Sequence, residues 1–432
     1  MSRRIVIVPL LAAVLAVWFF STSLSCSRQA RVVWQQQFDT GSGGFGSSVA
    51  CDGRDIIVGT TIYDTAGGRH PVWQLRRYDR NGRLNWHRAY RRGRDDSLAD
   101  VAVTADHDIV ATGWTGRLGT NLLPQLLLVR FSAHGEVKWE KEYRFDRFTR
   151  GMAVRLDTIG RIWVCGSMSP ISVIRIAPEA KYRQPPVEGC TDMFVARFDS
   201  LGNLLDSAVA DFGGDETAED LLLVPSHFRS RGGFFLAGIR TPLPGRPDTL
   251  RTKDIVVVSL DQDLKENWRW LYDSGDEDIA VRLSWQDLNL CAAVTSRRDS
   301  AVATELVEYS TDGCYHGVEQ ETRYPGASSA RCAALVRDRS GAVLGLGTSG
   351  APPTGRLLGW RYFRKQFTDF LTAGKYRSCA SDRANDVAVD ADGNVIVTGT
   401  SNSGRKSSVL VLKVALPRHK PPPGIWLPNM HR

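Results

Sequence analysis

Few stretches of this sequence combine the residue types and the spacing that chemistry requires. The segment GSGGFG at 41–46 fits the pattern G-x-G-x-x-G. It joins two expected strands and opens no helix, so the helix N-terminus that holds a phosphate in that motif is missing. No G-x-S-x-G nucleophile motif and no H-E-x-x-H metal motif occurs. The sequence therefore predicts no catalytic residue and no cofactor.

Metal-ligand spacing is equally scarce. The eight cysteines include no C-x-x-C pair and the eight histidines are scattered, so we expect no zinc site. Asp390, Asp392 and Asn394 place three oxygen-bearing side chains within five residues, but the further ligands and the distal Glu of an EF-hand are missing. We therefore expect a tight turn with Gly393 at positive φ, and no metal site.

The cysteines offer one structural prediction. Cys165 and Cys190 fall near the two ends of one long connection, and an exported chain can form disulfides. A bridge there would contribute roughly 2 to 4 kcal/mol. We predict that Cys165 pairs with Cys190, and the alternative is a set of small buried thiols. With Cys26 set aside seven cysteines remain, so at least one stays free.

The elements that carry these residues repeat along the chain. The stretch NDVAVDADGNVIVTG begins at Asn385, and weaker copies begin at 47, 99, 151, 219, 278 and 330, mostly about 53 residues apart. In each copy apolar residues alternate on both sides of a turn, which is the pattern of a β-hairpin. Forty glycines and scarce helical periodicity indicate an all-β chain.

A second hairpin follows most copies and ends in an aromatic strand. Trp86, Trp139 and Trp268 each precede a Tyr by four residues, so both rings face one side of their strand. Left in water, each ring would forgo roughly 1.5 to 3 kcal/mol of burial free energy. We therefore expect these aromatics to pack between neighbouring sheets. Four antiparallel strands at this period form a propeller blade.

The two ends of the repeat array complement each other. Residues 31–38 form a strand with Trp34 and no hairpin before it, while the seventh copy ends in SVLVLKVALP with no such strand after it. We predict that 31–38 completes the seventh blade and closes the ring, which removes an open sheet edge. The expected fold is a seven-bladed β-propeller over residues 31–416, followed by a Pro-rich tail at 417–432.

These copies resemble the SBBP repeats of bacterial exported and lipid-anchored β-propellers. The resemblance covers nearly all of 31–416 and is strongest in the last copy, DVAVDADGNVIVTG. The tryptophan strands are more distantly similar to the repeats of quinoprotein-like propellers. The resemblance implies a propeller fold and a bacterial envelope protein, and it implies no particular activity.

The first residues predict export. Two arginines precede an almost wholly apolar run at 5–20, and small residues then lead to Cys26. This is the pattern of a signal peptide, expected at 1–25. The exit resembles a bacterial lipoprotein signal, which implies that Cys26 carries lipid and that 26–30 is a short linker. The family pattern has Leu three residues before the cysteine, where this chain has Ser23. Ordinary cleavage and a retained membrane anchor are the alternatives.

Recognition is expected on one face of the disc. Turns within hairpins are short and alike, whereas connections on the opposite face vary in length, the longest being 59–72, 114–124, 167–192 and 239–253. Variable loops on a rigid scaffold are where binding usually occurs. The net charge of +8 could attract an anionic glycan or lipid, but export and the lack of aromatic-basic interleaving argue against nucleic acid.

We expect a monomeric, non-enzymatic envelope scaffold that binds a protein or glycan and is held at the membrane by its lipid. One alternative is a propeller enzyme, such as a lyase, a glycan hydrolase or a quinone-dependent dehydrogenase, with its site at the central channel. Another is an outer-membrane assembly factor. An enzyme should gather several ionisable groups with perturbed pKa values at the channel mouth, whereas a scaffold should show small and apolar residues there.

Overall fold

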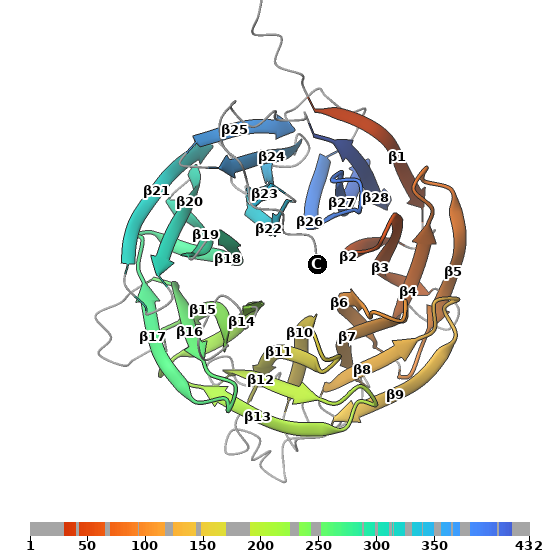
Figure 1. Ribbon diagram of the computed structural model, residues 1–432, viewed down its shortest axis with the longest axis horizontal. Helices are drawn as coiled ribbons and strands as arrows, with labels where there is room; N and C mark the ends of the chain where they lie inside the picture. The colour runs from red at the N-terminus through yellow and green to blue at the C-terminus, as the bar shows by residue number, and fades with distance from the viewer. Residues whose placement is uncertain are drawn as a thin grey trace, which may run out of the picture.

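The computed structural model contains seven four-stranded antiparallel sheets arranged as a ring around a central channel (Figure 1). This confirms the predicted seven-bladed β-propeller. The structure describes residues 30–39, 43–64, 70–93, 95–116, 124–143, 148–169, 191–224, 233–242, 252–286, 289–298, 301–310, 313, 315–324, 331–338, 340–349, 356–363, 366–371, 381–403 and 406–416. The expected signal peptide, linker and Pro-rich tail lie outside these ranges, except for residue 30.

Each of the first six blades uses four consecutive strands, ordered from the channel outward. The first three blades are β2 (Gly44–Asp52), β3 (Asp55–Asp64), β4 (His70–Tyr78) and β5 (Leu84–Tyr90); β6 (Ser97–Val103), β7 (Ile109–Thr115), β8 (Gln125–Phe131) and β9 (Val137–Tyr143); and β10 (Thr149–Leu156), β11 (Ile162–Met168), β12 (Asp192–Phe198) and β13 (Leu204–Ala210).

The next three blades have the same order. They are β14 (Asp215–Val224), β15 (Gly233–Thr241), β16 (Asp254–Leu260) and β17 (Glu266–Tyr272); β18 (Glu277–Gln286), β19 (Asn289–Arg298), β20 (Ala301–Ser310) and β21 (Tyr315–Tyr324); and β22 (Arg331–Arg337), β23 (Val343–Ser349), β24 (Arg356–Phe363) and β25 (Gln366–Leu371). Among the described residues, no helix is long and apolar enough to cross a membrane.

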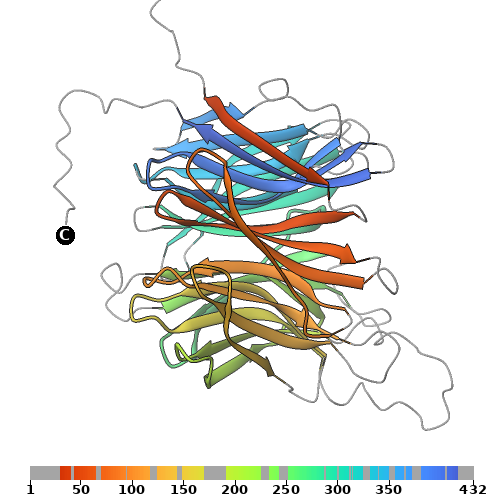
Figure 2. The same cartoon turned by 90° about the vertical axis from the view of Figure 1, so that its right-hand side faces the viewer.

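The seventh blade joins the two ends of the array. It contains β26 (Ser381–Val389), β27 (Val395–Ser403) and β28 (Lys406–Ala415), and its outermost strand is β1 (Arg31–Asp39). β1 runs antiparallel to β28, with Arg31 opposite Ala415 and Asp39 opposite Ser408. Figure 2 shows this first strand lying along the last blade. The predicted closure is therefore confirmed.

The hydrophobic core is divided among the junctions between blades. One cluster joins Ile57 and Trp73 of the first blade to Val101 and Leu127 of the second, and comparable clusters fill the other junctions. Middle strands are buried on both sides, as in β11 and β16, where every residue is buried. The blades thus form a stiff disc because each sheet buries both faces against its neighbours.

The turn at Asp390 has the expected geometry. Gly393 has a φ of 80°. The Asp390 Oδ1 atom accepts the backbone N–H groups of Asp392 at 2.9 Å and Asn394 at 2.8 Å. The Asp390 carboxylate also bonds Lys413 Nζ at 2.7 Å. The side chains are therefore used to build the hairpin between β26 and β27, as the sequence predicts.

Candidate functional site

The channel is lined by a repeated backbone irregularity. In all seven blades the register between the innermost strand and its neighbour shifts by one residue near the start of the strand. Such a β-bulge redirects one side chain out of the regular alternation. The bulged residues are Ser47, Ala99, Met152, Glu219, Ile279, Ala333 and Asn385, and all of them except Ile279 line one pocket.

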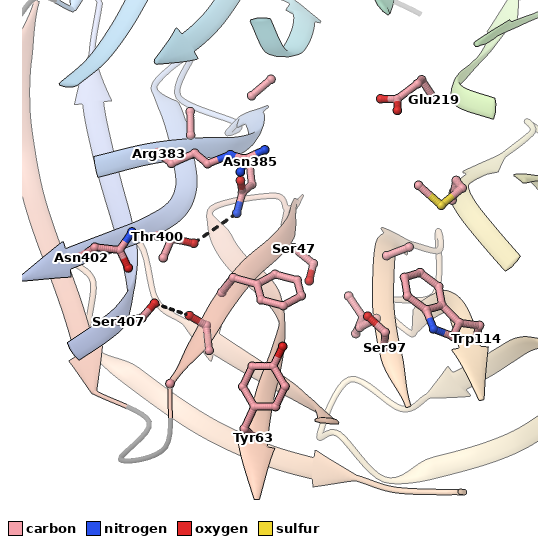
Figure 3. Close-up of a pocket in the computed structure, with 18 of the residues that line it drawn as sticks. Ser47, Tyr63, Ser97, Trp114, Glu219, Arg383, Asn385, Thr400, Asn402 and Ser407 are labelled. Carbon is pink, nitrogen blue, oxygen red and sulfur yellow. Dashed lines mark hydrogen bonds between the residues drawn. The ribbon is translucent and has the colours of Figure 1, made fainter. Parts of the chain in front are cut away.

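This pocket lies at one mouth of the channel and has a volume of about 590 Å³. Its wall includes Tyr63 near the end of β3, Trp114 near the end of β7 and Ser407 near the start of β28. Those strand ends belong to the face with the variable connections, which is where the sequence predicts recognition. Figure 3 shows Glu219 across the opening from Asn402 and Ser407.

Aromatic rings, amides and hydroxyl groups dominate the pocket wall. Three aromatic side chains, Phe45, Tyr63 and Trp114, are joined by polar side chains from the first, second and seventh blades, namely Ser47, Ser97, Asn385, Thr400, Asn402 and Ser407. The structure fixes several of them. Asn385 Nδ2 donates to the Gly46 carbonyl at 2.5 Å, and Ser407 Oγ donates to the Gly44 carbonyl at 3.1 Å. The wall is therefore positioned in advance for a polar ligand with apolar faces.

Among the described residues that line the pocket, three are charged: Glu219, Arg282 and Arg383. Arg282 Nη1 lies 2.6 Å from Glu219 Oε2, and Arg282 Nε donates to the Ala333 carbonyl at 2.7 Å. Burial alone would lower the pKa of Arg282, but Glu219 and Asp220 outweigh burial and hold that pKa above its usual range. Arg383 is exposed at the rim. The net charge of these three groups is positive.

A second set of charges binds the inner strands to one another. Three aspartates each follow a bulged residue and accept a backbone N–H from another blade. Asp100 accepts Val154 N–H at 2.9 Å, Asp220 accepts Leu283 N–H at 2.9 Å, and Asp386 accepts Val49 N–H at 2.8 Å. Because each of these hydrogen bonds joins two neighbouring blades, the aspartates hold the innermost strands of the ring together. We call Asp100, Asp220 and Asp386 the inter-blade aspartates.

Arg155 links two of the three aspartates. Its guanidinium lies 2.6 Å from Asp100 Oδ2 and 2.7 Å from Asp220 Oδ1. These two carboxylates outweigh the effect of burial and hold the pKa of Arg155 above its usual range. Asp386 has no comparable partner among the described cations, and burial followed by the charge of Asp100 raises its pKa to about 7.

The channel therefore matches neither expectation completely. The sign expected of a scaffold, only small and apolar residues at the channel mouth, is not met, because Glu219, Arg282 and Arg383 lie there. The ionisable groups are, however, occupied by ion pairs and backbone hydrogen bonds. In the described pocket wall, Glu219 is the one carboxylate, and there is no histidine or cysteine. One carboxylate cannot supply the ligand set of a metal or the pair of carboxyl groups that glycoside hydrolysis uses.

The predicted site residues lie elsewhere. Cys26 and Cys190 fall outside the described residues, so the pairing of Cys190 with Cys165, which is buried in the middle of β11, stays a prediction. Burial raises the pKa of the Cys165 thiol above its usual range.

The four tryptophans each lie against the next blade. Trp34 Nε1 donates to the Arg80 carbonyl and Trp86 Nε1 to the Ala133 carbonyl, both at 3.1 Å. The rings of Trp139 and Trp268 face Gly202 and Gly313. None of the four lines the pocket, so they contribute to the disc and not to the site.

Sequence reasoning did not predict the pocket wall or the inter-blade aspartates, although the repeat contains a pattern that marks both. The pairs Ala99-Asp100, Glu219-Asp220 and Asn385-Asp386 stand at one position of the repeat. The first member of each pair is the bulged residue that lines the pocket, and the second is the inter-blade aspartate. An aspartate near the start of an otherwise apolar strand, preceded in two of the three pairs by another polar residue, was therefore the readable sign of a bulge.

Comparisons with known proteins add no family. No family model matches the chain, and no curated protein matches it either. Among solved structures, polysaccharide lyase Uly1 superposes with a TM-score of 0.49 and 10% identity, covering 86% of this chain and 90% of the lyase. A protein of unknown function from Dyadobacter fermentans gives a TM-score of 0.48 and 9% identity, with 90% and 98% covered.

Trypanosoma rangeli sialidase gives a TM-score of 0.42 and 12% identity, covering 82% of this chain and 56% of the sialidase. Superpositions this loose carry no argument about a ligand or a reaction. The resemblance to SBBP-repeat propellers likewise finds no support in a matching family model. What the structure establishes is the architecture, a closed ring of seven four-stranded antiparallel blades.

Proposed function

We propose that this protein is a non-enzymatic propeller that binds a glycan in the pocket at the channel mouth. The observation that carries the proposal is the pocket wall, which combines three aromatic rings with amides and hydroxyl groups. A sugar ring offers apolar C–H faces that pack on aromatic rings, and its hydroxyl groups pair with amide and hydroxyl side chains. The volume of about 590 Å³ suits a short oligosaccharide segment.

The charged residues in the pocket wall suit binding of a glycan better than hydrolysis of its glycosidic bonds. Glycoside hydrolysis uses two carboxyl groups about 5 to 9.5 Å apart. The described wall has Glu219 alone, and Arg282 holds it at 2.6 Å. A carboxylate held in an ion pair is a poor proton donor because the partner favours its charged form. Arg383 at the rim favours glycans that carry an acidic group.

The test is binding of an oligosaccharide series, neutral and uronic-acid-containing, measured by titration calorimetry. We expect Asn402→Ala and Trp114→Ala to lower affinity at least tenfold, because both side chains line the pocket. Asn81→Ala is the matched control, since Asn81 is exposed on the within-hairpin turn of the first blade. Arg383→Gln should weaken binding of the acidic glycans and leave the neutral ones unchanged.

Two results would refute the proposal. One is the absence of binding across the series, or binding that Asn402→Ala and Trp114→Ala leave unchanged. The other is release of cleaved product on incubation of the glycans with the protein, which would make it an enzyme.

We further propose that the protein is exported and lipid-anchored as a monomer in a bacterial envelope. The support is the sequence of the first residues, where an apolar run leads to Cys26. Mass spectrometry of the first peptide of the mature protein tests this. A diacylglycerol mass on Cys26 supports the anchor, and a first peptide that starts elsewhere or lacks that mass refutes it.

A further inference from the structure

Three carboxylates converge where the third and fourth blades meet, away from the pocket. Asp192 is the first residue of β12, Asp211 directly follows β13, and Glu216 is the second residue of β14. One carboxylate oxygen from each lies within 4.8 Å of the other two. Like charges this close repel strongly unless a proton or a cation lies between them.

Glu216 supplies an independent indication of a missing partner. The residue is 0% exposed. Its Oε1 atom accepts the backbone N–H of Gly214 at 2.7 Å, whereas its Oε2 atom is buried and has no hydrogen-bond partner. A buried carboxylate oxygen without a partner costs about 1 to 3 kcal/mol or more. Burial, with the nearby Asp211 and Asp192, also raises the pKa of Glu216 to about 7.

The next junction contains a matching set of three carboxylates. The backbone N–H of Glu216 donates to the Thr191 carbonyl at 2.7 Å, and that of Asp278 donates to the Lys253 carbonyl at 2.9 Å. Glu216 and Asp278 therefore occupy equivalent positions. The residues that match the first triad at this junction are Asp254, Asp273 and Asp278.

The protein itself supplies the cation at the second junction. Arg240 stands opposite Asp254 across the β15–β16 ladder, and its Nη1 lies 3.6 Å from Asp254 Oδ2. Ser274 Oγ also donates to Asp278 Oδ1 at 2.7 Å. The residue opposite Asp192 in the equivalent β11–β12 pair is Met168. A neutral thioether thus stands opposite Asp192 where a guanidinium stands opposite Asp254. Arg240 also stands opposite Glu216 across the β14–β15 ladder, and Asp278 Oδ2, like Glu216 Oε2, has no hydrogen-bond partner.

We propose that Asp192, Asp211 and Glu216 bind one calcium ion. Three carboxylates form an all-oxygen donor set, which suits a hard cation and not zinc or copper. Calcium forms bonds of about 2.3 to 2.6 Å to six to eight oxygens in flexible geometry, so one ion can contact all three residues. Magnesium requires shorter bonds and near-ideal octahedral geometry, which a loop and two strand ends from different blades provide less readily.

The ion would tie the two blades together. Asp192 belongs to the third blade and Glu216 to the fourth, and Asp211 lies in the connection between them. A ligand that binds only the folded state raises its stability by mass action. Calcium should therefore raise the unfolding temperature, and this effect does not depend on glycan binding in the pocket.

The experiment uses full-length protein freed of metal with a chelator. Titration calorimetry with calcium chloride and thermal unfolding at 0 and 1 mM calcium are the measurements. We expect one calcium ion per chain and a rise in unfolding temperature. Glu216→Gln keeps the size of the side chain and an acceptor for Gly214 N–H, and it should lower calcium affinity at least tenfold. Asp278→Asn, at the equivalent position, should leave the calcium response unchanged.

Asp211→Asn provides a second variant that does not disturb the core, because Asp211 is exposed. It should also weaken calcium binding at least tenfold. Failure of wild-type protein to bind calcium at 1 mM overturns the proposal, and so does a calcium response that survives in both Glu216→Gln and Asp211→Asn. Binding of magnesium in place of calcium overturns the assignment of the ion. A Glu216→Gln variant that is stabilised while wild type ignores calcium identifies a shared proton instead.

Discussion

At the scale of single residues, one hydroxyl group joins two carboxylates in the inner ring. Ser48 Oγ lies 2.5 Å from Asp100 Oδ1 and 2.8 Å from Asp386 Oδ2. A hydroxyl has one proton to donate, so it can serve both only if one carboxyl group is protonated. Burial and the charge of Asp100 raise the pKa of Asp386 to about 7, and we therefore assign the shared proton to Asp386.

This proton predicts how stability depends on pH. Between pH 4 and pH 7 folded Asp386 keeps its proton, while the same group in the unfolded chain has lost it. The unfolded state then binds fewer protons, so the free energy of unfolding falls as pH rises through this window. Below pH 4 both states are protonated and the contribution is constant. Above pH 7 both are ionised, and the destabilisation is complete.

Asp386→Asn should flatten this dependence, because the amide does not titrate. Urea unfolding at pH 5.0 and pH 7.5 provides the measurement. The free energy of unfolding should fall less between the two values in Asp386→Asn than in wild type. Equal falls in the two proteins would show that Asp386 does not hold the proton.

At the scale of elements, four tryptophans pair with four turn glycines. The indole rings of Trp34, Trp86, Trp139 and Trp268 come within 2.7 to 3.0 Å of the position that a Cβ would take on Gly82, Gly135, Gly202 and Gly313 respectively. All four glycines have positive φ. The third blade has no such tryptophan, and the turn that faces it has no such glycine. Asp206 holds the register position of the tryptophan and pairs with Arg197, and the facing turn carries Leu264 in place of glycine. Glycine is needed only where an indole approaches.

Gly135→Ala should therefore cost more than its backbone conformation alone. A Cβ there would lie 2.9 Å from the Trp86 ring, whereas a Cβ on Gly160, which has the same φ of 83°, would meet nothing within 4 Å. We expect Gly160→Ala to lower the free energy of unfolding by about 1 kcal/mol through φ strain. Gly135→Ala should lower it by roughly 2 to 4 kcal/mol, because overpacking adds to that strain. Equal losses in urea unfolding would contradict the account.

At the scale of the whole molecule, one strand from the start of the chain completes the last blade. β1 pairs with β28 along eight positions of register. Trp34 contacts Tyr78 of the first blade, with ring centroids 6.3 Å apart. Without β1, the edge of β28 would expose unpaired backbone groups, and the cluster around Val409 and Val411 would lose Trp34 and Phe38.

Deletion of residues 1–39 should thus lower the unfolding temperature by more than 10 °C and promote association through the open edge. Deletion of residues 1–29 is the control, since it leaves β1 intact. Thermal unfolding and size-exclusion chromatography of both truncated proteins are the measurements. Identical behaviour of the two would show that β1 is not what closes the ring.

The sequence alone determined the sheets, their number and the closing strand. Hairpins follow from alternating Val and Ile around turns such as that at Gly393, and the count of copies fixes the count of blades, because each four-stranded unit is local in the chain. Trp34 without a hairpin before it indicated where the first strand must go. These features depend on strand period and turn chemistry, which nearby residues carry.

Only the tertiary structure decided which residues meet at the centre and between blades. Ser48 and Asp386 are 338 residues apart and meet because the ring closes. The pocket likewise gathers single bulged residues from six blades. Whether a buried carboxylate forms an ion pair with a guanidinium, as Asp254 does, or gathers with two other carboxylates, as Glu216 does, depends on how one sheet packs on the next. No period in the sequence records that packing, because it arises from contacts between separate repeats.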